Sequence, residues 1–233
     1  MYIIGINAYH ADSSACIIKD GKLITAVEEE RFTRIKHHAG FPKHSIKHCL
    51  ESCNIKLSDV DYLAINRDPK ANNLKRILYV LKNRPNLKHL IDRFKYRNKS
   101  QSIKNILNHE FNNDKFHGKV INIEHHLAHL SSCFHVSPFE ESCIISVDGF
   151  GDFASTVWGY GEKNDINIDK RIHFPHSLGI FYQSITQYLG FKNYGDEYKI
   201  MGLAPYGKPK YLNELKKILF IKSNGVFELN LKY

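Results

Sequence analysis

The residues best suited to chemistry lie in the segment EHHLAHLSS (residues 124–132), which directly follows a short apolar run. His125 and His129 are four positions apart, so on a helix their imidazoles project from one face and can reach one metal ion. His126 falls on another face. The start of such a helix could also receive a substrate phosphate. Two surface histidines on an amphipathic helix would give the same pattern, so the pair alone leaves both interpretations open.

A second motif, SVDGFGD (residues 146–152), places an acid at the end of a predicted hydrophobic strand. Asp148 can be a third ligand beside the two histidines, which gives a His₂-carboxylate set with positions left open for substrate. That set suits Fe(II), Zn(II) or Mn(II), and ligand type alone does not choose among these divalent metals. Gly149 and Gly151 let backbone or ligand approach closely, so they are candidate substrate-binding positions. A turn or capping carboxylate is the alternative for Asp148.

The opening loop GINAYHADSS (residues 5–14) puts small and hydroxyl residues between two predicted strands, where backbone N–H groups can cradle phosphate. We take Asn7, Asp12 and Ser13 as candidate substrate- or nucleotide-binding residues. His10 is a candidate catalytic group that could act on a carbonyl or hydroxyl. Ordinary hairpins use the same residue types, so the loop by itself does not establish a site.

Two further blocks carry charge. EEERFTRIKHH (residues 28–38) offers Arg34 and Lys36 as contacts for an anionic substrate group, with solvated surface charge as the alternative. DEYKIMGLAPYG (residues 196–207) carries Glu197 and Lys199 in a glycine-rich segment, and neither composition nor spacing assigns them a role.

The apolar periodicity predicts a β-β-β-α-β-α-β order. This order is typical of an α/β, ribonuclease-H-like lobe of the ASKHA (actin–Hsp70-like) type, with a mixed sheet flanked by helices. In open α/β sheets ligands collect at the carboxyl ends of strands, where these motifs fall. We expect one lobe over residues 1–207 with a helical insertion over 67–112. Residues 208–233 would begin the connection to a second lobe that is missing.

Composition narrows the class of protein. Of 233 residues, 42% are hydrophobic and 24% charged, which is ordinary for a soluble globular protein. No apolar run approaches the ~18–20 residues that span a bilayer, and no basic leader precedes the first strand. Five cysteines favour free thiols in a reducing compartment. We therefore expect a cytoplasmic protein with no membrane partner.

The formal net charge of +9 is concentrated in a Lys-, Arg- and Asn-rich stretch over residues 67–104. No aromatic residues interleave with it in the manner of an RNA-binding surface. We therefore expect a solvated basic face and no nucleic acid partner. The positive electrostatic field of these charges could also attract phosphorylated substrates.

Taken together, the blocks GINAYHADSSA, EERFTRIKHHAGFP, EHHLAHLSS, SVDGFGD, SLGIFYQSITQYLGF and DEYKIMGLAPYGK resemble the NodU-like carbamoyltransferases that modify nodulation factors, cephamycins and tobramycin. The resemblance covers residues 2–233. The Kae1-like tRNA threonylcarbamoyl-transfer proteins share the fold and the HxxxH pair. They lack the EERFTR and KIMGLAPYG blocks.

The resemblance implies a two-part catalyst. A YrdC-like domain makes carbamoyladenylate from carbamoyl phosphate and ATP, and a Kae1-like domain moves the carbamoyl group to an acceptor hydroxyl. It also implies a metal, usually iron, held by His125, His129, Asp148 and an aspartate of the second lobe. His10 and Lys36 would line the transfer site.

Members of that family are more than twice as long as this sequence, so we expect the isolated chain to be incomplete. A second ASKHA lobe and a YrdC-like domain would come from missing sequence or a separate chain, and a homodimer is a further expectation. The small-molecule hydroxyl acceptor, sugar-like or a secondary metabolite, stays open. The alternatives are a non-catalytic metal- or nucleotide-binding ASKHA lobe and a subunit of a split carbamoyltransferase.

Overall fold

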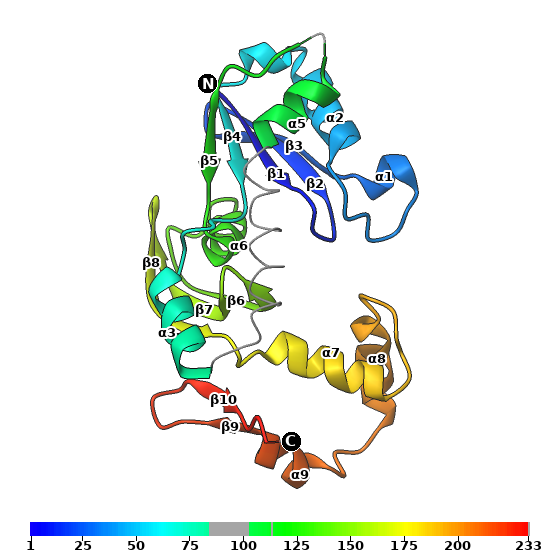
Figure 1. Cartoon of the computed structure of the whole chain (residues 1–233), viewed down its shortest axis with the longest axis vertical. Coiled ribbons are helices and arrows are strands. Elements are labelled where there is room, and N and C mark those ends of the chain that lie inside the picture. Colours follow the sequence, from blue (N-terminus) through cyan, green and yellow to red (C-terminus); the bar gives the residue numbers. More distant parts are fainter. Residues whose placement is uncertain (84–102, 113, 233) are drawn as a thin grey trace. The chain divides into compact units, whose positions relative to one another are not determined.

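Two units with separate cores make up the chain in a computed structural model, which describes residues 1–83, 103–112 and 114–232. The N-terminal unit comprises Met1–Lys70 and Ile77–Glu124. The C-terminal unit comprises Ala71–Arg76 and His125–Tyr233. Figure 1 labels their helices and strands.

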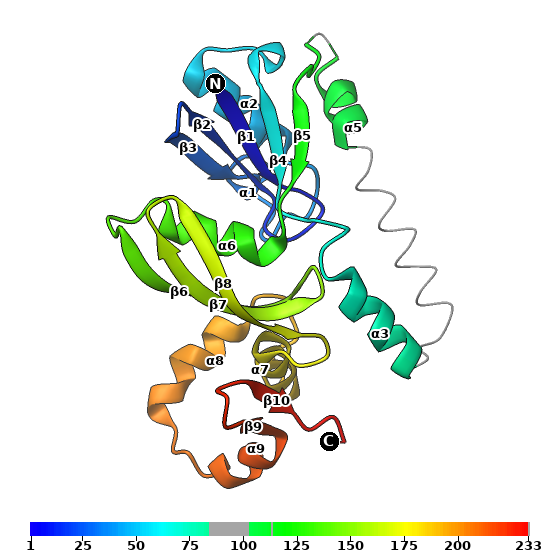
Figure 2. The ribbon, with the colours of Figure 1, turned by 90° about the vertical axis from the view of Figure 1, so that its left-hand side faces the viewer.

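A five-stranded mixed sheet organises the N-terminal unit. β1 (Tyr2–Asn7), β2 (Ser14–Lys19) and β3 (Lys22–Glu28) form an antiparallel meander. β4 (Tyr62–Ile65) then pairs parallel to β1, and β5 (Lys119–Asn122) pairs parallel to β4. The resulting order is β3-β2-β1-β4-β5, and Figure 2 shows these strands side by side.

Helices cover this sheet and close its core. α2 (Lys43–Cys53) contacts all three strands of the meander, and it follows the short helix α1 (Glu30–Thr33). The 3₁₀ helix η1 (Leu57–Asp59) leads into β4, and α5 (Ile103–Glu110) precedes β5. In β1, β2 and β4 buried side chains alternate with partly exposed ones, as a strand with one covered face requires. The core contains Ile4, Ile6, Ala15, Ile17, Ile46, Cys49, Leu50, Leu57, Val60, Leu63, Ile65, Ile103, Leu107 and Phe116.

The C-terminal unit is built on a three-stranded antiparallel sheet in the order β6-β7-β8. β6 (Glu141–Gly151), β7 (Ala154–Glu162) and β8 (Asp165–His173) follow α6 (His125–Phe134), and α7 (Leu178–Tyr188) comes next. Both α6 and α7 pack on β6. Its core is smaller and contains Leu130, Phe134, Ile144, Ala154 and Val157.

Short elements complete the chain. α8 (Glu197–Leu203), η2 (Ala204–Tyr206) and α9 (Leu212–Ile218) lead to a hairpin of β9 (Leu219–Ile221) and β10 (Phe227–Leu229). α3 (Asn73–Asn83) has its first residues in the C-terminal unit. All five cysteines are free thiols. Among the described residues no helix is both long and apolar enough to cross a membrane.

The predicted α/β class is confirmed. The N-terminal unit has a mixed sheet flanked by helices, and its order β3-β2-β1-β4-β5 is that of a ribonuclease-H-like lobe. One element prediction differs from the structure. The strand expected to end at Asp148 extends to Gly151, with a break in register after Val147, so Asp148 lies within the strand. The helical insertion expected over 67–112 contains α3 and α5, and its residues 84–102 lie outside the described residues.

The predicted lobe over residues 1–207 spans parts of both units, and the insertion over 67–112 includes Ala71–Arg76, which belong to the C-terminal unit. Residues 208–233 contain α9 and the β9–β10 hairpin. The assignment of one lobe and a connecting tail stays a prediction.

Candidate metal centre

The structure brings His125, His129 and Asp148 together in the C-terminal unit. One ligand atom from each lies within 4.8 Å of the other two, and this is the one such group of His, Cys, Asp or Glu found among the described residues. The His125 Nε2 and His129 Nε2 atoms are 3.1 Å apart. Asp148 Oδ2 is 2.7 Å from His125 Nε2 and 3.6 Å from His129 Nε2. Three donor atoms therefore point at one place.

The amphipathic character of α6 explains why the histidines differ in exposure. Leu130 and Phe134 pack into the core, and His125 and His126 are also buried. His126 is fully buried, and its Nδ1 lies 2.9 Å from Ser146 Oγ, so it points away from the metal group as expected. The side chain of His129 is 51% exposed. The group therefore has one buried ligand and an open side.

Hydrogen bonds fix the charge of Asp148. Hydrogen bonds with His125 and then His129 hold the pKa of this carboxyl far below its ordinary value, although burial opposes them. The backbone N–H of Gly149 donates to Asp148 Oδ1 at 2.6 Å. Asp148 is therefore a carboxylate, which is the form that ligates a metal.

Two glycines let the backbone lie directly against the candidate ligands His125 and Asp148. A Cβ at Gly151 would overlap the His125 ring, and a Cβ at Gly179 would lie 2.7 Å from the backbone of Asp148. Ser177 Oγ donates to the Asp148 carbonyl at 3.0 Å and accepts from the Ile180 N–H, which caps α7. The start of α7 thus holds the strand that carries Asp148.

The donor set fits a divalent cation. His125 Nε2 lies 2.7 Å from Asp148 Oδ2 and 3.1 Å from His129 Nε2, and a single N–H cannot satisfy both the carboxylate and the second imidazole lone pair. A cation in that place would use both lone pairs and the carboxylate. Two histidines and a carboxylate suit Fe(II), Zn(II) or Mn(II).

In the N-terminal unit the opening loop is tied to the loop that follows α1. Backbone N–H groups of Tyr9 and Ser13 donate to the carbonyls of Gly40 and His38 at 3.0 and 2.8 Å. Ser13 Oγ also donates to Gly40 at 2.7 Å. Ser13 is only 1% exposed, and its hydroxyl is used in this hydrogen bond, which ties the two loops together.

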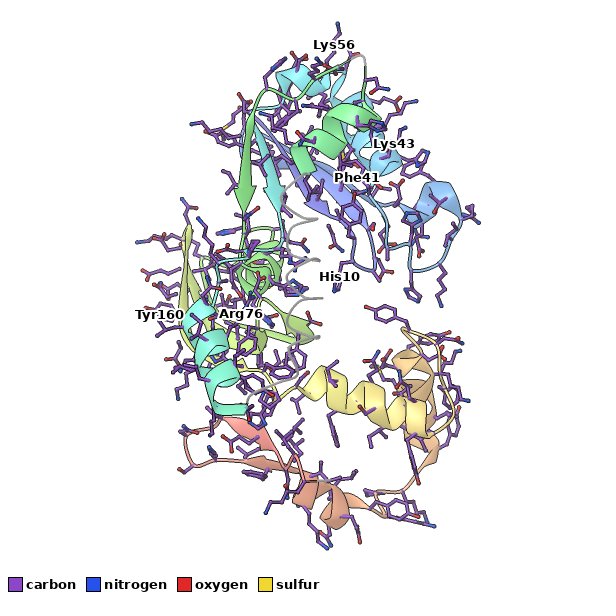
Figure 3. The ribbon with its side chains drawn as sticks, in the orientation of Figure 1. His10, Phe41, Lys43, Lys56, Arg76 and Tyr160 are labelled. Carbon is purple, nitrogen blue, oxygen red and sulfur yellow. The ribbon has the colours of Figure 1, made fainter. Side chains whose placement is uncertain are left out.

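The remaining candidates of this loop lie near one another. Asn7 Nδ2 donates to the Asp12 carbonyl at 2.8 Å, and Asp12 Oδ1 lies 2.8 Å from His37 Nδ1. His10 is exposed in the loop after β1 (Figure 3), with its Nδ1 2.7 Å from the Ala11 carbonyl. Lys36 is exposed in the facing loop. Their roles stay predictions.

The other charged candidates have local partners. Arg34 ends α1 with φ of 60°, and its backbone N–H donates to Glu30. Lys199 Nζ lies 2.6 Å from Asp196 Oδ1, and this hydrogen bond raises the pKa of Lys199. Glu197 is in the first turn of α8. No role is fixed for any of them by these contacts.

The sequence did not reveal Glu29, which is 1% exposed. Its carboxylate accepts hydrogen bonds from the backbone and side chains of His44 and Ser45, at the start of α2. Burial raises its pKa, but these bonds outweigh burial and leave the pKa below its ordinary value. Within the run of three acids, the residue types do not show which one is buried. Only the position of Glu29 directly after an apolar strand indicates it.

Comparison with known proteins decides the family. The family described as "Carbamoyltransferase N-terminus" matches residues 2–233. The chain belongs to this family. It is 39% identical to the uncharacterized protein sll1178 of Synechocystis sp. over all of this chain and 39% of that protein. It is 34% identical to the nodulation protein NolNO of Sinorhizobium fredii, over 97% of this chain and 32% of NolNO.

The protein MJ1051 of Methanocaldococcus jannaschii is 31% identical over 97% of this chain and 37% of its own length. The chain therefore spans about a third to two fifths of the length of these relatives. Among solved structures, YeaZ from Pseudomonas aeruginosa matches 73% of this chain and 64% of its own, with 13% identity and a TM-score of 0.38.

Proposed function

We propose that the chain is the N-terminal part of an O-carbamoyltransferase that moves a carbamoyl group from carbamoyladenylate to a hydroxyl of a sugar-like or secondary-metabolite acceptor. Family membership supports the reaction class. The observation that carries the proposal is the convergence of His125, His129 and Asp148 on one point. The carbamoyladenylate would come from carbamoyl phosphate and ATP.

His125, His129 and Asp148 would hold a divalent metal, with Fe(II) favoured and Zn(II) or Mn(II) as alternatives. When bound, the cation would neutralise charge on the adenylate phosphate. The open side at His129 leaves room for a further protein ligand and for substrate.

Transfer needs positioning and a base, because the mixed anhydride is already activated. The acceptor oxygen bonds to the carbamoyl carbon, the bond from that carbon to the phosphate oxygen breaks, and AMP leaves. The hydroxyl proton passes to His10. When His10 Nδ1–H donates to the Ala11 carbonyl, the lone pair stays on Nε2, as a general base requires. Lys36 would bind negative charge on the substrate.

The rest of the catalyst would be further polypeptide that carries a second ASKHA lobe and an adenylate-forming, YrdC-like domain. The greater length of the relatives supports this. So do the large apolar side chains exposed along residues 188–221, since such surface usually marks an interaction site. They include Tyr188, Tyr206, Tyr211 and Ile221.

The test is carbamoyl transfer from preformed carbamoyladenylate to candidate acceptors, with the chain joined to the remaining domains of a relative. We expect transfer with wild type, and loss of transfer with His129→Ala and with Asp148→Ala. Glu162→Ala, an exposed acid at the far end of β7, is the matched control and should keep full transfer. Transfer that survives both ligand substitutions would contradict the proposal. Metal binding without transfer would favour a non-catalytic metal-binding lobe.

A further inference from the structure

The hairpin turn beside the metal centre has an unexpected sequence. Asp152 and Phe153 form the two-residue turn between β6 and β7, closed by the pair Gly151 and Ala154. Both turn residues have positive φ, 47° and 74°. Turns of this kind favour Asn-Gly or Asp-Gly, and a bulky residue in the left-handed region is strained. Strained positions persist where surrounding contacts hold them.

Asp152 contacts the helix that carries both histidine ligands. Its Oδ2 accepts a hydrogen bond from the backbone N–H of His125 at 2.9 Å. The first N–H groups of a helix have no partner within the helix, and the helix dipole favours an anion there. Asp152 therefore caps α6 from a different element, at the residue that is also a candidate ligand.

The beginning of α3 holds this carboxylate and its turn. The side chain of Asp152 is only 2% exposed, and Arg76 Nη2 lies 3.8 Å from its Oδ1. A buried carboxylate needs such compensation. The Arg76 guanidinium also lies 5.9 Å from the centre of the Phe153 ring. Asn72 Nδ2 donates to the Asp152 carbonyl at 2.9 Å. Figure 3 labels Arg76 on α3.

From these contacts we propose that Asp152 and Arg76 are positioning residues for the metal centre. Asp152 fixes the backbone of His125, while the neighbouring Gly151 lies against the His125 ring. Arg76 fixes the Asp152 carboxylate. The strained turn thus sets His125 in place from two sides. This inference rests on the proposed metal site, because positioning matters only if His125 is a ligand.

The experiment is a Co(II) titration of the purified chain, followed by the visible absorption of the bound metal. Asp152→Ala should weaken Co(II) binding about 10- to 100-fold, the range for residues that orient metal ligands. Asp152→Asn should lose less, because its amide oxygen can still accept from His125 N–H. Arg76→Ala should also lose less than Asp152→Ala. Asp165→Ala, an exposed acid beside the β7–β8 turn, is the matched control and should bind as wild type does.

A second readout does not involve metal. Hydrogen exchange at the His125 amide should be faster in Asp152→Ala than in wild type, and unchanged in Asp165→Ala. If Asp152→Ala does not fold, the Co(II) affinities of Asp152→Asn and Arg76→Ala are compared with that of wild type instead.

The possible failures are distinguishable. Wild type that binds no Co(II) would overturn the proposed metal site together with this inference. Wild type that binds Co(II), with equal affinity in Asp152→Ala, Asp152→Asn and Arg76→Ala, would overturn the inference alone.

Discussion

Two antiparallel meanders, one in each unit, end up in different surroundings. In the N-terminal unit, β1 is central, because β2 pairs with one edge and β4 adds parallel to the other. In the C-terminal unit, β6 pairs with β7 and is the edge of its sheet, as far as the described residues extend. β4 and β5 extend the first meander into a five-stranded sheet, whereas no strand of the described residues pairs with the other edge of β6.

The two strands also differ in how far their apolar side chains are covered. Ile4 and Ile6 of β1 are 0% and 3% exposed, whereas Ile145 and Val147 of β6 are 65% and 51% exposed. Long, apolar edge strands attract other strands, and proteins normally cover them. The comparison therefore supports the proposal that further polypeptide completes the C-terminal unit.

The largest effect should come from opening the closed core. Ile17→Ala in β2 removes a side chain that is 0% exposed and should destabilise the protein by about 2–5 kcal/mol. Ile145→Ala in β6 should change stability by less than about 0.5 kcal/mol, as exposed substitutions usually do. Urea unfolding measures both. Equal losses would mean that β6 is covered in solution by something else.

A substitution at Gly151 tests how closely the backbone packs against His125 in the metal centre. In Gly151→Ala the new Cβ overlaps the His125 ring, which should cost about 1–3 kcal/mol by overpacking and weaken metal binding. Gly202→Ala is the control, because a Cβ there meets no atom within 4 Å. Thermal unfolding with and without Zn(II) separates the two variants. A Gly151→Ala protein that Zn(II) stabilises as much as wild type would count against close packing of His125.

A smaller effect tests the buried acid of the N-terminal unit. Glu29→Gln leaves hydrogen-bond donors of His44 and Ser45 without a full set of acceptors, so it should cost about 1–3 kcal/mol at neutral pH. The folded pKa of Glu29 lies below its ordinary value, so its contribution is present above the unfolded pKa of about 4.3. That contribution disappears as pH falls through the lower folded pKa.

Unfolding of wild type and Glu29→Gln across pH 7 to 3 measures this contribution. The gap between the two proteins should narrow towards the acid end. A gap that widens as pH falls would reverse the sign of the proposed shift.

Substitutions in the edge strand β6 should change stability least and self-association most. Ile145→Lys with Val147→Lys should reduce self-association of the chain in light scattering, with little change in stability, because charged edges resist strand pairing. Val120→Lys on β5, an edge strand of only four residues, is the control. Association that persists in the double variant would place the contact surface elsewhere.

Much of the architecture could be predicted from the sequence. Apolar periodicity gave the order of strands and helices in the first part of the chain, and the four-residue spacing predicted that His125 and His129 share a face. Periodicity is local, however, and does not show where one core stops and another starts. Both units contain a three-stranded antiparallel meander, so such a pattern does not mark the division between them.

The residues that support the site were harder to find. Glu29, Ser177 and Asp152 act on backbone groups of residues that are 15 to 29 positions away. Nothing in the local pattern distinguishes such a residue from a turn or surface residue. The residues able to ligate a metal were found because their chemistry is unusual, whereas the supporting residues use common side chains in buried positions.

The most direct test of the central claim is calorimetric titration of the chain with Fe(II), Zn(II) and Mn(II), each compared between wild type and His125→Ala. Wild type should bind one equivalent of at least one of these cations, and His125→Ala should bind none of it. The affinity should be modest, because three ligands leave the coordination open. Equal binding by the two proteins, or no binding by wild type, would contradict a metal centre at His125, His129 and Asp148.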